Sequence, residues 1–250
     1  VRSRVQWLIV FLAMIVIMTV ISYYFSIHYK SVLAQERELL GGIVKHLELN
    51  LSGRLTALQF VAADTEPKKL DQKEMNQDLI KTVEILKFFN ARIFDRQGKI
   101  IAEAWPSFNT AEVQDRESFN QVLEGSLIIS DVIVSEKYQR PYISLRVPVH
   151  RENKQIEAVL AGGILLDDLA GLVEMELLPL CHYIFIKDNN NRTVYYPHPQ
   201  EGAVQSRFFR DMQIDFQQKP RGVISDKSVE DDEDLIYIYD TLKNSNWQVV

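Results

Sequence analysis

The longest run of hydrophobic positions lies near the N-terminus. From Trp7 to Ile27 no residue is charged, and Leu, Ile, Val, Met and Phe dominate. A bilayer core about 30 Å thick needs roughly 20 apolar residues of helix to cross it. Trp7 at one end, with Tyr23 and Tyr24 at the other, matches the aromatic belts of membrane interfaces. The pattern predicts a transmembrane helix over residues 7–27.

Two alternative interpretations fit this run less well. The apolar region of a cleaved signal peptide usually has about 7–15 residues before a small-x-small cleavage site, and this run is longer and ends in bulky side chains. A buried core helix would be unusually long for a chain of 250 residues. Arg2 and Arg4 precede the run and Lys30 follows it, so the small charge bias predicts that residues 1–6 are cytoplasmic and the remainder is exported.

Helical periodicity continues beyond the predicted span, over residues 28–63. This stretch has no Pro, and its hydrophobic residues recur at spacings of three, four and seven. We therefore expect a stalk helix whose apolar face packs against the flank of a domain or against a partner helix, as in a parallel homodimer. Gly41 and Gly42 are a weak point, each costing about 1 kcal/mol relative to Ala. The apolar stripe consists of Leu33, Leu40, Val44, Leu47, Leu51, Leu58 and Val61.

Beyond the stalk, helical patterns alternate with strand patterns in which every second residue is apolar. This order predicts an α+β fold with antiparallel sheets, not a doubly wound parallel sheet. The pattern restarts once, which predicts two modules in tandem, over residues 64–178 and 179–250. Helices are expected over residues 72–88, 116–123 and 167–177. Strands are expected over residues 90–95, 100–105, 128–135, 142–150 and 158–166, then 182–187, 193–196, 222–225, 235–239 and 247–250.

Charge and cysteine content narrow the function classes. The chain has 34 acidic and 28 basic residues, a formal net charge of −6, and Arg2, Arg4 and Lys30 flank the span, so the exported part is more acidic still. An acidic exterior gives no support for nucleic-acid binding, which needs a basic face. Cys181 is the sole cysteine, so no intrachain disulfide forms and the core alone must hold the fold. Because the chain does not begin with Met and ends in a strand-like apolar run, we interpret it as a fragment cut at a domain edge.

The sequence carries no recognisable catalytic or metal-binding pattern. None of the five histidines lies at a metal-type spacing from another His or from Cys181. Residues 188–191 lack the Gly and the final acid of a calcium loop and predict a hairpin turn, and the acidic run 230–234 predicts a solvated loop. Phosphate-binding, nucleophile-elbow and dinucleotide motifs are missing as well. We expect no catalytic residue, metal or cofactor, so an anchored hydrolase is the weakest alternative.

Several short phrases follow one another in a characteristic order. Together with the anchor and the stalk, that order resembles the double Cache family of bacterial extracytoplasmic sensor domains, and the resemblance covers about Tyr29 to Val250. The phrases are Asp115-Arg116-Glu117-Ser118-Phe119, Pro148-Val149, Ala161-Gly162-Gly163 with the helix start at Asp167, Ile186-Lys187-Asp188, Val194-Tyr195-Tyr196-Pro197-His198-Pro199 and Trp247-Gln248-Val249-Val250.

The resemblance implies a function. Both modules would be PAS-like, residues 64–178 forming the membrane-distal module with a small-molecule pocket and residues 179–250 the membrane-proximal one. Such domains sense ligands for chemoreceptors, histidine kinases and diguanylate cyclases in the bacterial inner (plasma) membrane, with the bulk of the chain periplasmic or extracellular. Ligand would close the distal module and signal through the stalk helix. The alternative is an interaction module for a periplasmic binding protein, with no direct ligand.

The resemblance also implies site residues. The amino-acid-binding branch of the family has Arg-x-Trp-Tyr and a later Asp. Here Arg116 fits the Arg, Ser118 and Phe119 replace the aromatic pair, and Gly163 stands near the Asp position. The missing acid disfavours an amine ligand, whereas an Arg suits a carboxylate. By family position the candidate ligand-binding residues are Arg116, Ser118, Phe119, Ser130, Asp131, Tyr142 and Ser144.

Plainer roles compete with these assignments. Arg116 is equally suited to an ion pair with Asp115, and Asp115, just before a predicted helix, suits an N-cap. Phe119 fits a core position. Tyr142 and Ser144 are two residues apart in a predicted strand and therefore share one face of the sheet.

Overall fold

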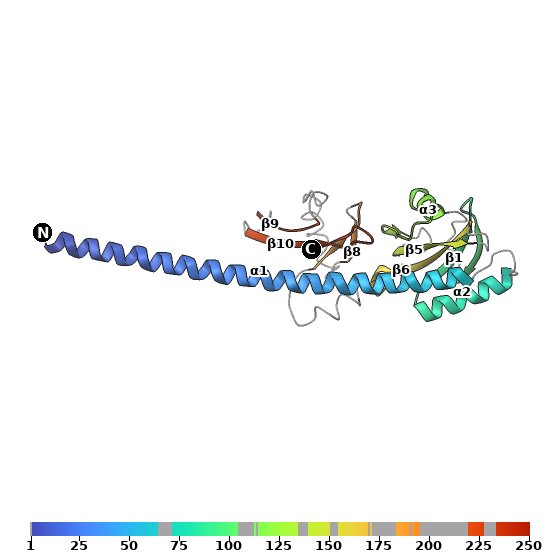
Figure 1. The fold of residues 1–250 in the computed structure, drawn as a ribbon, viewed down its shortest axis with the longest axis horizontal. Helices are drawn as coiled ribbons and strands as arrows, with labels where there is room; N and C mark the ends of the chain where they lie inside the picture. The colour runs from blue at the N-terminus through green and yellow to red at the C-terminus, as the bar shows by residue number, and fades with distance from the viewer. Residues whose placement is uncertain are drawn as a thin grey trace. The chain divides into compact units, whose positions relative to one another are not determined.

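A computed structural model of the chain shows an α+β fold, as the sequence predicts (Figure 1). Its elements form two compact units, residues Val1–Gly42 and Ile43–Val250. The structure describes residues 2–64, 72–104, 113, 115–134, 140–150, 155–169, 171, 184–190, 192–195, 220–227 and 234–250. The predictions for Cys181, His182, His198 and most of the acidic run 230–234 concern residues outside these ranges.

Helix α1 (Arg2–Asp64) includes the predicted span and the predicted stalk, and Gly41 and Gly42 do not interrupt it. By length and composition α1 is able to cross a membrane, since its most apolar 18-residue window has a mean hydropathy of 2.3 and none of that window is buried. Within the unit that starts at Ile43, one face of α1 is buried, and this face includes four members of the predicted stripe. Its buried residues are Ile43, Val44, Leu47, Leu51, Leu55, Leu58 and Ala62.

The first sheet has the strand order β2-β1-β6-β5-β3, with β4 also paired to β5. All of its pairs are antiparallel. Helix α2 (Gln72–Leu86) contacts β1 and β2, and α3 (Arg116–Leu123) contacts β3, β5 and β6. The strands are β1 (Asn90–Asp95), β2 (Ile100–Ala104), β3 (Ile128–Ile129), β4 (Ile133–Val134), β5 (Pro141–His150) and β6 (Ile156–Leu165).

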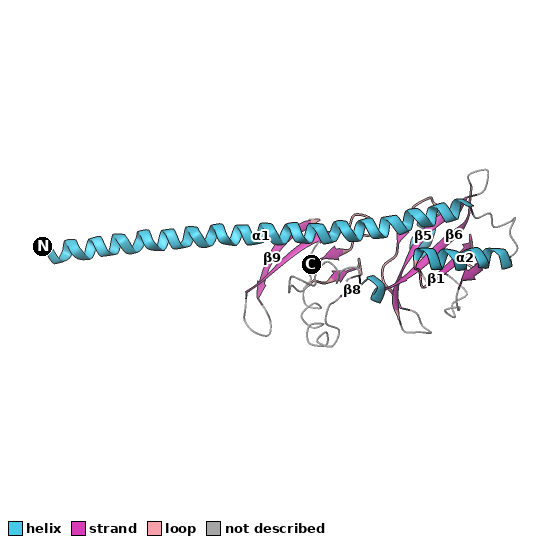
Figure 2. Ribbon diagram, turned by 90° about the horizontal axis from the view of Figure 1, so that it is seen from below, coloured by secondary structure: helices cyan, strands magenta, loops and turns pink. Residues whose placement is uncertain are grey.

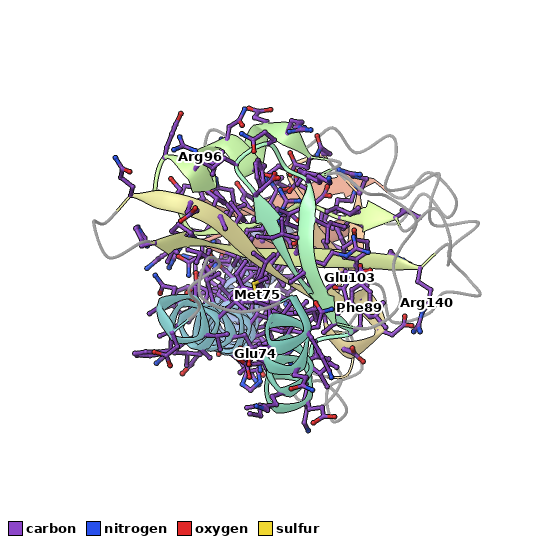
Figure 3. All side chains as sticks on the ribbon, turned by 90° about the vertical axis from the view of Figure 1, so that its right-hand side faces the viewer. Glu74, Met75, Phe89, Arg96, Glu103 and Arg140 are labelled. Carbon is purple, nitrogen blue, oxygen red and sulfur yellow. The ribbon has the colours of Figure 1, made fainter. Side chains whose placement is uncertain are left out.

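One face of the first sheet is covered by helices. Figure 3 shows α2 and the end of α1 beneath the sheet, with Met75 between α2 and the strands, and Figure 2 shows the two helices side by side. Residues 143, 145 and 147 of β5 and 158, 160 and 164 of β6 face this way and are fully buried. Burying a side chain such as Leu or Ile is worth about 1.5–3 kcal/mol, so this helix face provides most of the core of the sheet.

The second sheet has the strand order β8-β7-β11-β10-β9, again antiparallel throughout. The turn after β10 is bonded to α1, because Lys243 N–H donates to Glu48 Oε1 at 2.8 Å and Asn244 Nδ2 donates to Ser52 Oγ at 2.7 Å. The strands are β7 (Ile186–Lys187), β8 (Thr193–Tyr195), β9 (Arg221–Lys227), β10 (Asp234–Thr241) and β11 (Gln248–Val249).

One predicted strand needs correction, and one predicted helix is described only in part. The single strand expected over 128–135 is split into β3 and β4, because Ser130 leaves the ladder: its Oγ accepts a hydrogen bond from Ser144 N at 2.9 Å and donates to Asp131 O at 2.8 Å. Of the helix expected over 167–177, residues 166–169 and 171 are helical, and the rest lies outside the described residues.

Reciprocal hydrogen bonds join the two sheets. The Asp131 carboxylate accepts from Asn189 N at 3.2 Å, Asn189 Nδ2 at 2.9 Å and Asn190 Nδ2 at 2.7 Å. In return, the buried carboxylate of Asp188 accepts from Val132 N at 2.9 Å. We call Asp131, Val132, Asp188, Asn189 and Asn190 the inter-sheet clasp. Residues 188–190 of the predicted hairpin turn therefore also hold the two sheets together.

Candidate functional site

Small residues on β6 lie between polar residues of its two neighbours. β6 is paired with β1 on one side and β5 on the other, and residues that share a row point to the same face of the sheet. This is the face opposite the helices α1 and α2. The two rows are Asn90–Gly163–Ser144 and Arg92–Ala161–Arg146.

A cavity lies over these two rows. Besides the residues of the rows, Phe94, Val113, Ile133 and Tyr142 line it. It offers about 40 Å³ to the centres of water molecules. One water needs at least about 10–15 Å³ on that measure, so the cavity accommodates a few waters or a small polar group in the conformation seen here.

Gly163 is required by its neighbours. A Cβ built at this position would overlap Asn90 Oδ1 and the ring of Phe89. The Phe89 ring in turn packs edge-on against Tyr142, with centroids 5.1 Å apart. An acidic side chain at position 163 would therefore displace residues that shape the cavity.

Arg146 is the most engaged polar residue of the cavity. Its side chain is 6% exposed, and Nη1 donates to Ser118 Oγ at 2.8 Å, to Asp115 O at 3.2 Å and to Asp115 Oδ2 at 3.3 Å. Nε lies 3.4 Å from Ser144 Oγ. Among the described residues, none accepts a hydrogen bond from Nη2. Burial lowers the pKa of Arg146, and Asp115 opposes this, so the group stays cationic at neutral pH.

Arg92 is a second buried guanidinium at the cavity. Its side chain is 8% exposed, and Nε lies 3.7 Å from Glu103 Oε2 on β2. Burial lowers the pKa of Arg92, opposed by Tyr142 and by Glu103. Burial raises the pKa of Tyr142, opposed by Arg92 and Arg146. The cavity therefore presents two cations and a neutral phenol.

Four of the predicted site residues line the cavity or are hydrogen-bonded to a residue that lines it. Tyr142 and Ser144 line it from the same face of β5, as their spacing predicts. Ser118 accepts from Arg146 and donates to Asp115. Ser130 is hydrogen-bonded to Ser144: its backbone N–H donates to Ser144 O, and its Oγ accepts from Ser144 N.

The other three predicted residues lie elsewhere in the described structure. Phe119 is 1% exposed in an apolar cluster and packs edge-on against Phe94. Asp131 belongs to the inter-sheet clasp. Arg116 is exposed, and its Nη1 donates to Gln97 O in the turn between β1 and β2. Its neighbour Asp115 is the N-cap of α3 and accepts from Ser118 N, the plainer role that its position predicts.

Sequence reasoning passed over Asn90, Arg92 and Arg146. A signal for the arginines was available. Each stands in the middle of a predicted strand whose other residues are largely apolar, and Arg146 continues the alternation of Tyr142 and Ser144. A charged residue at such a position is seldom buried without a partner or a function.

The described part of the chain therefore has two antiparallel sheets in tandem, with a small polar cavity over the first. The chain belongs to the Cache domain family: the family model matches residues 26–250. No curated protein matches the sequence.

Solved structures share the fold. The ligand-binding domain of the Campylobacter jejuni chemoreceptor Tlp3, in complex with L-valine, has 14% identity and a TM-score of 0.62 over 88% of this chain and 92% of that one. The extracellular domain of the candidate histidine kinase rpHK1S-Z16 has 15% identity and a TM-score of 0.64 over 87% and 93%. The ligand-binding domain of the Pseudomonas aeruginosa chemoreceptor PctC, in complex with GABA, has 15% identity and a TM-score of 0.60 over 86% and 96%.

Cache domains are ligand-binding sensor domains, and the solved structures named above are ligand-binding or extracellular domains of chemoreceptors and of a candidate histidine kinase. Cache domains are extracellular parts of membrane receptors, and the apolar segment of α1 has the length and composition for the membrane span that such a receptor needs.

Proposed function

We propose that this chain is the extracytoplasmic sensing part of a bacterial transmembrane receptor, and that it binds a small carboxylate-bearing molecule in the cavity over the first sheet. The observation that carries the proposal is the buried Arg146 with an uncommitted Nη2 at the cavity. The ligand-binding residues are then Tyr142, Ser144, Arg146, Arg92 and Asn90, with Ser118 holding the Arg146 side chain.

The energetics support a carboxylate ligand. A buried guanidinium loses its hydration, and Asp115, at the rim of the site, shares its carboxylate with the N-terminus of α3. A ligand carboxylate would supply the missing acceptor through charge-assisted hydrogen bonds, each worth about 1.5–3 kcal/mol. Because the cavity is small, the module must open to admit a ligand and close around it.

The order of contacts along α1 supports a topology for this receptor. Residues 7–27 would span the inner membrane with residues 1–6 inside, and residues 28–63 would form the stalk. The turn after β10 of the second sheet is hydrogen-bonded to α1 at Glu48 and Ser52. These two residues come earlier in the helix than the buried Leu58 and Ala62. This order supports residues 64–178 as the membrane-distal module and 179–250 as the proximal one, with a homodimer forming through the stalk.

A short bonded path leads from the cavity toward the second sheet. Ser144 in the cavity is bonded to Ser130, and Ser130 adjoins Asp131 of the inter-sheet clasp. Closure around a ligand would move this path if the ligand prefers the closed state, and a nearly complete switch needs about a 10⁴-fold preference. The output could be that of a chemoreceptor, a histidine kinase or a diguanylate cyclase.

The interaction-module alternative has less support, because that role would favour a closed or apolar-filled cavity and this one is polar. The hydrolase alternative has less still, since the described residues contain no cluster of metal-binding side chains.

A thermal-shift screen of the full chain in detergent against small carboxylates, amino acids, amines and purines tests the proposal. A ligand at 100 times its Kd stabilises the folded state by about 2.7 kcal/mol, well within detection. Arg146→Met should abolish the response to the carboxylate that binds, whereas Arg116→Ala should retain it. If Arg116→Ala abolishes the response and Arg146→Met retains it, the site lies around Arg116 instead. A screen in which nothing stabilises the wild type would remove the support for direct sensing.

A further inference from the structure

Two guanidinium groups border the cavity from opposite sides. Arg92 on β1 and Arg146 on β5 stand in one row, with Ala161 of β6 between them. Their Cα atoms are therefore two inter-strand spacings apart, about 10 Å for a usual spacing of about 4.8 Å. Because Ala161 is small, no bulky side chain separates the two arginines at the floor of the cavity.

Asp115 and Glu103, the acidic residues that face Arg146 and Arg92, do not line the cavity. Asp115 and Glu103 have side chains 34% and 33% exposed, whereas the guanidiniums that they face are 6% and 8% exposed. Glu103 Oε2 is 3.7 Å from Arg92 Nε, beyond hydrogen-bonding distance. Among the described residues that line the cavity, none is acidic. Among the described lining residues, the charges that a ligand meets are those of Arg92 and Arg146.

Tyr142 lines the same cavity as Arg92 and Arg146. Both Arg92 and Arg146 act on its hydroxyl group, opposing the rise that burial causes in its pKa. The phenol stays neutral at physiological pH, because burial raises its pKa above the ordinary value of about 10. The arrangement suits two anionic groups held a few ångströms apart.

We propose that the ligand class is small dicarboxylates, with one carboxylate bound by Arg146 and the other by Arg92, an inference that rests on the proposed function. A zwitterionic amino acid is poorly suited, because its ammonium group would face the second guanidinium. The cavity also has no room for a compensating acid at position 163, where Asn90 and Phe89 occupy the space of any side chain.

The test compares three ligands with the same four-carbon chain: succinate, butyrate and 4-aminobutyrate. They differ only in the second end, which is a carboxylate, a methyl group or an ammonium group. Binding to the full chain in detergent is measured by calorimetry at constant ionic strength, because exposed charges are screened by salt. Succinate should bind at least about tenfold more tightly than butyrate, the gain from one further charge-assisted hydrogen bond. The affinity for 4-aminobutyrate should be the lowest.

Substitution of single arginines tests whether Arg92 binds the second carboxylate. Arg92→Met should reduce succinate binding to the level of butyrate and leave butyrate binding unchanged, whereas Arg146→Met should weaken both. Arg116→Met, at an exposed arginine outside the lining, is the matched control and should change neither. If Arg92→Met does not fold, Arg92→Lys and the wild-type ratio of the three affinities still decide the matter.

The outcomes separate the two proposals. Equal affinity for succinate and butyrate, or a preference for 4-aminobutyrate, overturns the dicarboxylate class and leaves carboxylate sensing in place. Failure of all three ligands, together with a carboxylate screen that yields nothing, overturns the proposed function itself.

Discussion

The two faces of the first sheet are made by the same strands and have opposite chemistry. On the helix face, residues such as Ile143 and Leu145 are completely buried against α1 and α2. On the cavity face, Ser144 and Arg146 alternate with them along the same strand, β5. The helix face is built for stability. The cavity face buries the guanidinium groups of Arg92 and Arg146. The comparison predicts that substitutions on the helix face change stability and that substitutions on the cavity face change binding.

The largest change in stability is expected for a substitution on the helix face. Leu58 of α1 is 0% exposed, so Leu58→Ala should lower the free energy of unfolding by about 2–5 kcal/mol, through lost burial and the cavity left behind. Chemical denaturation measures it. Phe60→Ala on the same helix, at a side chain 71% exposed, is the control and should stay within about 0.5 kcal/mol of the wild type. Similar losses for the two variants would show that the buried face of α1 is not part of the core.

A smaller loss is expected where the cavity face requires the absence of a side chain. Gly163→Ala should cost about 1–3 kcal/mol, because its methyl group collides with Asn90 and Phe89. Gly53→Ala, on α1 with nothing within 4 Å of the added methyl group, should instead stabilise by up to about 1 kcal/mol. Chemical denaturation of the two variants in parallel measures both changes. If Gly163→Ala and Gly53→Ala change stability in the same direction, the proposed collision at position 163 is wrong.

Arg146→Met should separate binding from stability most clearly. Without ligand it should lower the free energy of unfolding by about 1–3 kcal/mol, the cost of leaving the hydrogen-bonding partners of the lost guanidinium unsatisfied; the cost stays below that of breaking a fully buried ion pair because solvent reaches Asp115. Asp115 retains its bond from Ser118 N and partial exposure to solvent. The same variant should lose the carboxylate response. A loss of stability as large as that of Leu58→Ala would mean that the cavity face also carries the fold.

The smallest expected effect is the pH dependence that Tyr142 gives to the free energy of unfolding. The pKa of Tyr142 is raised in the folded state, so its stabilising contribution is complete below about 10, the ordinary value, and is lost as pH rises further. The difference in unfolding free energy between wild type and Tyr142→Phe should therefore be flat at neutral pH and shrink in alkaline solution. A difference that grows with alkaline pH would mean that the pKa of Tyr142 is lowered in the folded state, with Arg92 and Arg146 outweighing burial.

Local pattern was sufficient wherever a residue's role depends on its own neighbours in sequence. The bounds of α3 and β1 match the predicted ranges, because an N-cap at Asp115 and alternation over residues 90–95 are local signals. The split between β3 and β4 was not predictable, since it depends on the hydroxyl of Ser130 meeting Ser144 across the sheet.

The chain's sequence by itself determined the apolar span, the helical stalk, the order of two antiparallel modules and the face that Tyr142 shares with Ser144. Only the tertiary structure decided which charges meet over that face. The pairing of β1, β6 and β5 places Arg92, Ala161 and Arg146 in one row, with Ala161 in the middle. Arg116 instead donates a hydrogen bond to Gln97 O in the turn between β1 and β2. The physical reason is that strand register, which no local pattern specifies, sets which residues of distant segments share a row.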